Sequence, residues 1–283
     1  MSGSRVAVVT DSTSYLPAAL VAQHGIEVVP LQVVIGGTAY DEGGETSSAT
    51  VSEALRRWTP VSTSRPGPAA FADAYARAAD RGCDGVVSVH LSARMSGTVE
   101  SAQLAAKESP VRTEVVDSRS LGMGLGYAVL AAAQAASAGA TVDEVADVAR
   151  RRAESTSAVF YVDTLEHLRR GGRIGPAAAL LGSALAVKPL LHLVDGQIEP
   201  LEKVRTSSRA IARLEELAVE RAGQQPVDVA VHHLANPDRA ASLAERLRAR
   251  LVELKDLHVS EVGAVVGAHV GPGMLAVVVA PHV

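Results

Sequence analysis

The chain has 283 residues, of which 47% are hydrophobic and only 3% aromatic, and its formal net charge at pH 7 is −4. So much apolar side-chain surface, with so little net charge, excludes an intrinsically disordered protein. A nucleic-acid-binding protein is disfavoured as well, because such proteins need a positive field and aromatic rings on which bases stack. The length predicts one large or two ordinary domains with a sizeable core.

The first half of the chain alternates short β-rich runs with longer helical patterns. Strands are predicted at Val6–Thr10, Gly85–His90 and Thr113–Val116. Helices are predicted at Tyr15–His24, Ala69–Ala79, Thr98–Lys107 and Leu121–Ser137. This alternation predicts a parallel sheet with helices on its faces, and the segments Val28–Ile35 and Thr38–Tyr40 predict an added hairpin.

Near residue 155 the composition turns polar and charged, and we place a domain boundary there. The predicted domains are residues 1–155, an α/β domain, and residues 156–283, an α+β domain with a mixed or antiparallel sheet. Helices of the second domain are predicted at Ala177–Ala186, Ser208–Ala222 and Pro237–Val252. Its strands are predicted at Ala158–Val162, Val187–Val194, Gln197–Val204, Val227–His232, His258–Val262 and Met274–Val279.

Cysteine content and the hydropathy of the two ends favour a cytoplasmic protein with no membrane segment. Cys83 is the single cysteine, so an internal disulfide is impossible, which fits a reducing compartment. The N-terminus lacks the apolar core of a signal peptide. Val262–Val283 has no Asp, Glu, Lys or Arg and is long enough to cross a bilayer, but His269, Gly271-Pro-Gly273 and Pro281 predict a strand, a tight loop and a buried strand there.

Several common catalytic and cofactor motifs are missing from the sequence. There is no G-x-x-x-x-G-K-[ST] loop for a nucleotide phosphate and no G-x-S-x-G turn for a serine nucleophile. The glycines of 122–126 lie too far from a strand for a dinucleotide-binding turn, and no histidine pair has the spacing of zinc ligands. We therefore expect neither a metal ion nor a cofactor.

Four turns rich in hydroxyl groups lie at predicted strand-to-helix junctions. Helix N-termini lined with Ser and Thr can hold an anion through N–H and O–H groups without Lys or Arg. Each turn alone is better explained as an ordinary helix cap, but four of them at one rim of a sheet predict a binding site. The turns are Thr10–Ser14, Ser62–Pro66, His90–Thr98 and Val116–Ser118.

These turns belong to a longer series of motifs that keep their order over nearly the whole chain. They are VTDSTSYLP (9–17), TSRP (63–66), LSARMSGTVESA (91–102), VDS (116–118), LEHLRRGGRI (165–174), VKPLL (187–191), GQI with KVR (196–205) and GAHVGPG (267–273). In these motifs the chain resembles the DegV family. The resemblance implies a two-domain α/β lipid carrier that encloses a fatty acid, in many bacteria as the fatty-acid-binding subunit of a fatty acid kinase.

The resemblance also implies where a long-chain fatty acid lies. Its carboxyl group is held by Thr63, Ser96 and His269 at a Ser/Thr-lined mouth, and its acyl chain fills a buried tunnel between the two domains. The mouth is supported by Asp11, Ser12, Ser64, Gly97 and Thr98. The sequence departs from the family pattern at Arg65, where many members have Gln, and at Ala93, where they have Ser. Arg65 adds a positive charge near the rim.

The aliphatic composition suits such a ligand. A chain of about sixteen carbons gains roughly 12 kcal/mol gross on leaving water, at about 0.8 kcal/mol per methylene. The candidate lining residues are Ala177–Ala186 and Val187–Leu193, although plain core packing is the better explanation of any one of them. Neutral hydroxyl donors satisfy a carboxyl group without locking it in an ion pair, which suits a carrier that later exposes an oxygen to a phosphoryl donor.

A basic cluster in the second half of an otherwise acidic chain predicts a partner surface. The resemblance assigns Arg173, Lys203 and Arg205 to the docking of an ATP-dependent kinase subunit, where complementary charge speeds association. Solvated helix faces and loop anchors also explain this charge and are favoured by the residues alone, and docking is the alternative that the resemblance suggests.

We expect a carrier without catalysis of its own. The competing hypothesis is a hydrolase or phosphotransferase in which Ser96 or Ser12 attacks the substrate, with His269 as the base and Asp11 or Asp117 orienting it. The missing nucleophile turn and the missing phosphate loop count against this enzyme.

Overall fold

The computed structural model describes residues 5–44, 48–57, 59–180 and 188–282 of the chain. Contacts divide the chain into two compact units. The first unit consists of Met1–Gln32 and Ser64–Ser155, and the second of Val33–Thr63 and Thr156–Val283. These units differ from the predicted domains 1–155 and 156–283 in one respect, because residues 33–63 pack with the C-terminal half.

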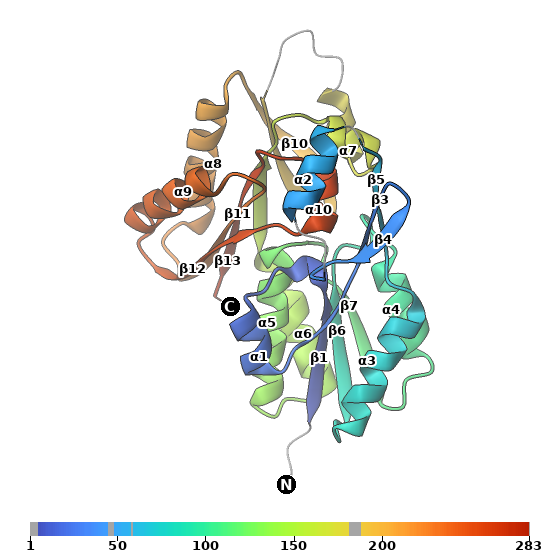
Figure 1. The fold of residues 1–283 in the computed structure, drawn as a ribbon. Coiled ribbons are helices and arrows are strands. Elements are labelled where there is room, and N and C mark those ends of the chain that lie inside the picture. The colour runs from blue at the N-terminus through green and yellow to red at the C-terminus, as the bar shows by residue number, and fades with distance from the viewer. Residues whose placement is uncertain (1–4, 45–47, 58, 181–187, 283) are drawn as a thin grey trace. The chain divides into compact units, whose positions relative to one another are not determined.

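The first unit is a parallel sheet of four strands with helices on both faces (Figure 1). The strand order is β2-β1-β6-β7, and each neighbouring pair runs parallel. The strands are β1 (Val6–Asp11), β2 (Glu27–Val29), β6 (Gly85–His90) and β7 (Arg112–Asp117). The helices are the 3-10 turn η1 (Ser12–Ser14), α1 (Ala18–His24), α3 (Pro68–Asp80), α4 (Thr98–Ala106), α5 (Met123–Ser137) and α6 (Val142–Ser155).

Helices on both faces of the parallel sheet explain why the central strand β6 is buried along its whole length. All of its residues are buried, as expected of a parallel strand with helices on either side. Phe71 and Tyr75 of α3 are fully buried in one cluster with Val9 of β1. Helices α5 and α6 contact the sheet from its other face. Gly126 lets α5 come close to η1, since a Cβ there would lie 2.9 Å from the carbonyl oxygen of Ser14.

The second unit contains a mixed sheet of six strands and a small antiparallel sheet of three. The large sheet has the order β10-β9-β8-β13-β11-β12, with β11 and β12 parallel and the other pairs antiparallel. Its strands are β8 (Ser157–Tyr161), β9 (Lys188–Val194), β10 (Gln197–Val204), β11 (Val227–His233), β12 (Leu254–Glu261) and β13 (Leu275–Pro281). The small sheet, in the order β4-β3-β5, consists of β3 (Gln32–Ile35), β4 (Thr38–Asp41) and β5 (Val61–Ser64). The helices are α2 (Ser48–Arg56), α7 (Glu166–Arg170), the 3-10 helix η2 (Gly175–Leu180), α8 (Ser207–Ala222), α9 (Pro237–Arg250) and α10 (Ala264–Val270).

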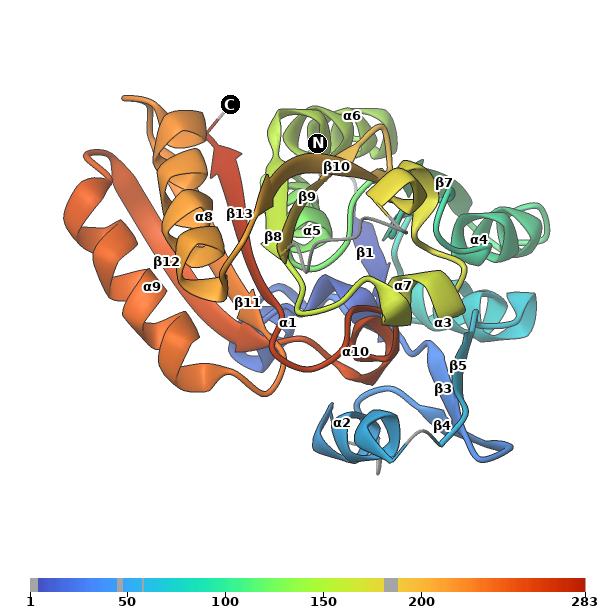
Figure 2. The ribbon, with the colours of Figure 1, turned by 90° about the horizontal axis from the view of Figure 1, so that it is seen from above.

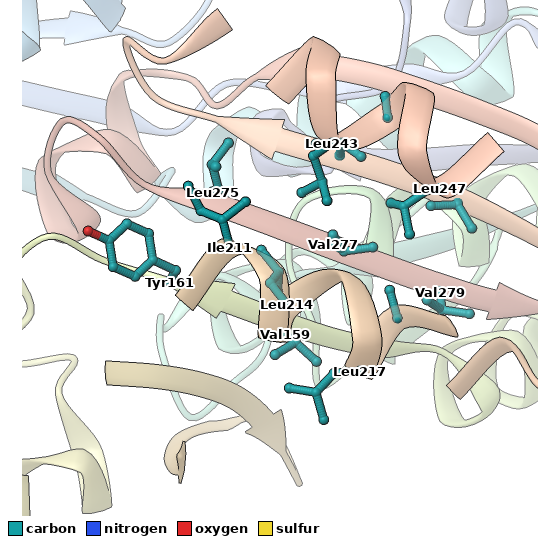
Figure 3. Close-up of a cluster of buried hydrophobic side chains, with 14 of the residues drawn as sticks. Val159, Tyr161, Ile211, Leu214, Leu217, Leu243, Leu247, Leu275, Val277 and Val279 are labelled. Carbon is teal, nitrogen blue, oxygen red and sulfur yellow. The ribbon is translucent and has the colours of Figure 1, made fainter. Parts of the chain in front are cut away.

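Helices α8 and α9 cover one face of the large sheet (Figure 3). Alternate strand residues, among them Val159, Tyr161 and Val277, meet Leu214 of α8 and Leu243 of α9 in the core of this unit. Because side chains alternate along a strand, the residues between them point to the opposite face of the sheet.

That opposite face is apolar where β9, β8 and β13 lie side by side. Phe160 pairs with Leu191 on one side and with Ala276 on the other, so the three side chains share this face. Ala158 and Val278 form the next row. Phe160, Leu191 and Val278 are buried. The large sheet therefore carries buried apolar side chains on both of its faces.

Helix α10 is flanked by helices from distant parts of the sequence (Figure 2). Val51 of α2 joins Ala264 and Ala268 of α10 in one hydrophobic cluster, to which Val33 of β3 also belongs. Helix α7 contacts α10 as well. This packing is the reason why residues 33–63 belong to the second unit.

The predicted fold class is confirmed, since an α/β chain with a parallel N-terminal sheet and a mixed C-terminal sheet is what the structure shows. Three predicted elements are wrong. Val28–Ile35 is not one strand, because Pro30 cannot donate a ladder hydrogen bond and separates β2 from β3. Tyr15 adopts a φ of 47° and precedes α1 instead of starting it. Residues 264–270 form α10 where we expected a strand, because a short apolar run fits either element.

The predicted helix Ala177–Ala186 is described only in part. Its first residues belong to the 3-10 helix η2, and residues 181–187, with the start of the predicted strand Val187–Val194, lie outside the described residues. Among the helices that the structure describes, none has the length and apolar content required to span a bilayer.

Candidate functional site

Three of the four hydroxyl-rich turns lie at one edge of the parallel sheet. They follow β1, β6 and β7, which are neighbours in the strand order. The fourth turn, Ser62–Pro66, begins on β5 of the small sheet, so the prediction that all four share one rim is wrong. The chain continues from β1 to β2 on one side, while β6 lies on the other side of β1. Open α/β sheets bind ligands at such a reversal of strand order.

Asp11 joins the two turns at this reversal. Its side chain is fully buried and accepts hydrogen bonds from Thr13 N (3.0 Å), Thr13 Oγ1 (2.6 Å), His90 Nδ1 (3.1 Å) and Leu91 N (2.9 Å). The bonds from Thr13 fix the η1 turn, and the bonds from His90 and Leu91 fix the loop after β6. Asp11 therefore fixes the positions of the two turns relative to each other.

A buried chain of hydrogen bonds continues from Asp11 into the sheet. Tyr75 donates to Ser88 Oγ (2.9 Å), which lies 2.7 Å from His90 Nε2. Burial raises the pKa of Tyr75 to about 12, so the phenol remains a donor. The order serine, histidine, aspartate is that of a catalytic triad. Ser88, His90 and Asp11 are each 0% exposed, however, so this array belongs to the core of the first unit.

The two serines considered as nucleophiles have other partners. Ser12 Oγ accepts a hydrogen bond from Leu31 N (3.0 Å), which ties η1 to the segment after β2. Ser96 Oγ lies 2.9 Å from Oγ1 of the buried Thr98. Neither serine is placed against an imidazole by these bonds, and the buried Ser88 hydroxyl is the one that lies beside His90, so this geometry gives the hydrolase hypothesis no support.

Arg65 lies across the loop that carries Ser96. Its guanidinium forms an ion pair with Glu100 (2.7 Å) and reaches the carbonyl oxygen of Gly97 (3.5 Å). A Cβ at Gly97 would lie 1.8 Å from Arg65 Nη1, so only glycine at this position leaves space for the arginine side chain. The predicted positive charge at the rim is thus paired with Glu100. The neighbouring Ser64 donates to Arg65 O (3.3 Å).

In the second unit Thr63 and His269 form a polar pair. Thr63 Oγ1, near the end of β5, lies 2.8 Å from His269 Nε2, in the last turn of α10. The structure therefore brings together two of the three residues assigned to the carboxyl group. The third, Ser96, belongs to the first unit.

The surroundings of His269 favour a neutral ring. Burial and the positive charge of Arg173 lower the pKa of His269 to about 4. Its Nδ1 is buried without a hydrogen-bond partner among the described residues, and a Cβ at Gly171 would lie 2.0 Å from this nitrogen. An unpaired buried N–H is rarer than an unpaired acceptor, so we assign the single ring proton to Nε2, which donates it to Thr63 Oγ1. The hydroxyl proton of Thr63 is then free for an acceptor outside the pair.

Two glycines let α7 and the end of α10 approach each other. His269 lies over Gly171, and His167 of α7 lies over Gly271, where a Cβ would be 2.2 Å from His167 Cδ2. Gly271 also has a φ of 74°, a conformation that favours glycine. Each imidazole fills the space that a side chain on the other segment would need. From the sequence we assigned no role to His167. A signal was present, because the motifs LEHLRRGGRI (165–174) and GAHVGPG (267–273) each contain a histidine followed within four residues by a glycine.

The predicted docking residues lie at different places in the second unit. Arg173 is beside His269, and its Nη1 donates to the carbonyl oxygen of Gly171 (2.7 Å). Lys203 is on β10 and Arg205 follows it, and both are exposed. Within the described ranges, no three His, Cys, Asp or Glu side chains form a group that could hold a metal ion.

Comparison with known proteins decides the family. The model of the family described as "Uncharacterised protein, DegV family" matches residues 5–282. The chain belongs to the DegV family. It is 62% identical over 274 residues to a DegV domain-containing protein of Streptomyces coelicolor, a match that covers 97% of this chain and 98% of the relative. A DegV domain-containing protein of Mycobacterium tuberculosis is 40% identical over 275 residues, with 97% and 96% covered.

Solved structures of DegV proteins share the whole fold. The structure described as "Fatty Acid Binding of a DegV family Protein from Thermus thermophilus" has a TM-score of 0.93 at 35% identity, and the match covers 98% of this chain and 100% of that one. DegV of Bacillus subtilis, described as a fatty acid binding protein, has a TM-score of 0.90 at 34% identity, with 99% and 100% covered.

Two buried histidines predict that this DegV protein is sensitive to acid. Burial lowers the pKa of His232 to about 4, and burial with the charge of Arg173 does the same for His269. In the unfolded chain a histidine titrates near 6.5. Between about pH 6.5 and pH 4 the unfolded state therefore binds more protons, so stability is fully present above this range and falls on acidification, by up to about 3 kcal/mol per histidine.

Urea unfolding at several values between pH 8 and pH 4.5 measures this loss. His232→Gln and His269→Gln are each expected to make the profile shallower below pH 6.5, and the plateau between pH 7 and pH 8 serves as the internal reference. A double variant that loses stability as steeply as the parent protein would assign the acid sensitivity to other groups.

Proposed function

We propose that this DegV protein binds a long-chain fatty acid with its carboxyl group at Thr63 and His269, and that it presents this group to an ATP-dependent kinase subunit. The observation that carries the proposal is the Thr63–His269 pair, in which a neutral imidazole leaves the hydroxyl proton of Thr63 for a ligand. The fatty-acid-binding DegV proteins of T. thermophilus and B. subtilis, at 35% and 34% identity, support the class of ligand.

The residues around the pair suit an anionic head group. Thr63 donates its hydroxyl proton to one carboxylate oxygen, and the charge of Arg173, which already acts on His269, stabilises the anion. Ser96 supplies a second hydroxyl group in the role that the family pattern implies. The proposed mouth also includes Asp11, Ser12, Ser64, Gly97 and Thr98.

The acyl chain requires an apolar surface of some length. The face of the large sheet opposite α8 and α9 carries the buried side chains of Phe160, Leu191 and Val278, and we assign it to the acyl chain. Leu191 lies in the strand that the sequence proposed as lining. Each buried methylene contributes about 0.8 kcal/mol, which makes chain burial the main source of affinity.

Presentation to a kinase subunit explains why the head group is held weakly. Hydroxyl donors satisfy a carboxylate but leave it free to attack a phosphoryl donor supplied by a partner, so the protein itself needs no catalytic group. The exposed Lys203 and Arg205 form part of the proposed docking surface.

The test is the fatty acid content of the protein purified from a bacterial host, measured by solvent extraction and mass spectrometry. Thr63→Val keeps the shape of the side chain and removes the donor, and we expect fatty acid affinity to fall about 10–100-fold, the range for a hydrogen bond to a charged group. Adding Ser96→Ala to Thr63→Val should lower the fatty acid affinity further. Ser62→Ala, which removes the exposed hydroxyl of the preceding residue on β5, is the matched control and retains the ligand.

Unchanged fatty acid in the double variant Thr63→Val with Ser96→Ala would refute the carboxylate site. The kinase half of the proposal is separated by Arg205→Glu, which should weaken acyl phosphate formation with the kinase subunit and leave the fatty acid content intact. Loss of both properties together would argue against docking at Arg205.

A further inference from the structure

We infer that Glu42 is a positioning residue of the carboxylate site, because it fixes the helix that carries His269. The importance of this role rests on the proposed function, whereas its geometry lies wholly within the second unit. Glu42 follows β4 and is 8% exposed. Its Oε1 accepts a hydrogen bond from Val265 N (2.8 Å), which is 223 residues later in the sequence.

Helix α10 has few stabilising features of its own. It is 7 residues long, and Gly263 at its N-cap has no side chain with which to cap it. Isolated helices of this length are unstable in water, so outside contacts decide where α10 lies. The carboxylate of Glu42 satisfies one of the free N–H groups of the first turn and places a negative charge at the positive end of the helix.

The cap also sets the rotation of α10 about its axis. His269 lies four residues after Val265, about one helical turn, so the capped amide and the imidazole are on the same side of the helix. A rotation by one residue, about 100°, would carry Nε2 away from Thr63.

One sheet holds both fixed points of this arrangement. Thr63 is on β5, and Glu42 directly follows β4, so the small sheet β4-β3-β5 carries the hydroxyl group and the helix cap together. Val51 of α2 packs against Ala264 and Ala268 of α10 and gives the helix a third contact with residues 33–63. Contacts from residues 33–63 therefore help to set the distance between Thr63 Oγ1 and His269 Nε2.

The experiment compares Glu42→Ala and Glu42→Gln in protein stripped of lipid, with Glu53→Gln as the matched control. Glu53 is an exposed carboxylate on the neighbouring α2, where it pairs with Arg57. The ring nitrogen signals of His269 are titrated by NMR and assigned from their absence in His269→Gln, and palmitate affinity and urea unfolding are measured on the same samples.

Glu42→Ala is expected to move the titration of His269 from about pH 4 toward 6.5 and to weaken palmitate binding about tenfold, because the ring leaves its buried position. Glu42→Gln is expected to rescue both properties, since its amide oxygen still accepts from Val265 N. Glu53→Gln should change neither.

Lower stability of Glu42→Ala with an unchanged His269 titration would overturn the inference and leave Glu42 a purely structural residue. A shifted titration with unchanged palmitate affinity would support the positioning role but refute the proposed carboxylate site. If Glu42→Ala does not fold, Glu42→Asp, which keeps the charge but is one methylene too short to reach Val265 N, is interpreted by the same two outcomes.

Discussion

Replacing Asp11 by alanine is expected to lower the free energy of unfolding by about 3–5 kcal/mol. The substitution leaves four buried donors without their acceptor, namely Thr13 N, Thr13 Oγ1, His90 Nδ1 and Leu91 N. Each unpaired buried donor costs about 1–3 kcal/mol, and relaxation of the two turns recovers part of the sum. Urea unfolding measures the total loss, and hydrogen exchange at the amides of Thr13 and Leu91 shows whether the opening begins there.

Asp117→Ala provides the matched control for this experiment. Asp117 also ends a strand of the parallel sheet, and its Oδ1 accepts from Ala93 N (3.2 Å) and Arg119 N (2.8 Å). These two bonds lie at an exposed position, so water replaces the carboxylate and the expected loss is about 1 kcal/mol or less. Equal losses in the two variants would show that burial of Asp11 does not govern its contribution.

Replacing Gly171 by alanine is expected to weaken fatty acid binding at least about tenfold, although alanine suits the backbone there. Gly171 has φ −73° and ψ −8°, which every residue adopts easily. The added Cβ would lie 2.0 Å from Nδ1 and 2.8 Å from Cε1 of His269, so the ring must move and its contact with Thr63 is lost. Palmitate titration of lipid-free protein measures the effect.

Two further variants separate this clash from a general effect of alanine. Gly67→Ala is the control, because Gly67 has φ −70° and open space around its missing Cβ. The clash with the His269 ring should also make Gly171→Ala less stable than the parent protein. In the background of His269→Ala the clash disappears, so Gly171→Ala should then leave stability unchanged, while fatty acid binding remains weak. A stability loss that persists in this background would place the strain elsewhere than at His269.

The sequence predicted the fold where periodicity and turn chemistry agreed. The buried run Gly85–His90 between two helical patterns is β6 as predicted, and the strand predicted at Gln197–Val204 is β10. The helix α10 was not predicted because an apolar run of seven residues is too short for its periodicity to distinguish a helix from a strand. Contacts with α2 and α7, which no local pattern encodes, decide between the two.

The sequence proposed residues of the candidate site but not the contacts between them. Thr63 and His269 were assigned from short motifs, and the structure joins them over 206 positions. Asp11 was assigned to the support of a ligand mouth, and in the structure its hydrogen bonds tie together two turns from within the core. Nothing near Glu42 in the sequence indicates a helix cap, because its partner is Val265 and the hydrogen bond exists only in the folded chain.

The second unit is built from two separate stretches of sequence, and this affects the order in which its contacts form during translation. Its small sheet and α2 leave the ribosome early, but Val265, the partner of Glu42, is synthesised 223 residues later. At 5–20 residues per second this interval is roughly 10–45 s. Throughout it, the apolar side of α2 lacks α10, and Thr63 lacks its histidine. The Thr63–His269 contact is therefore among the last to form during biosynthesis, and a nascent chain that stops before α10 contains Thr63 but not His269.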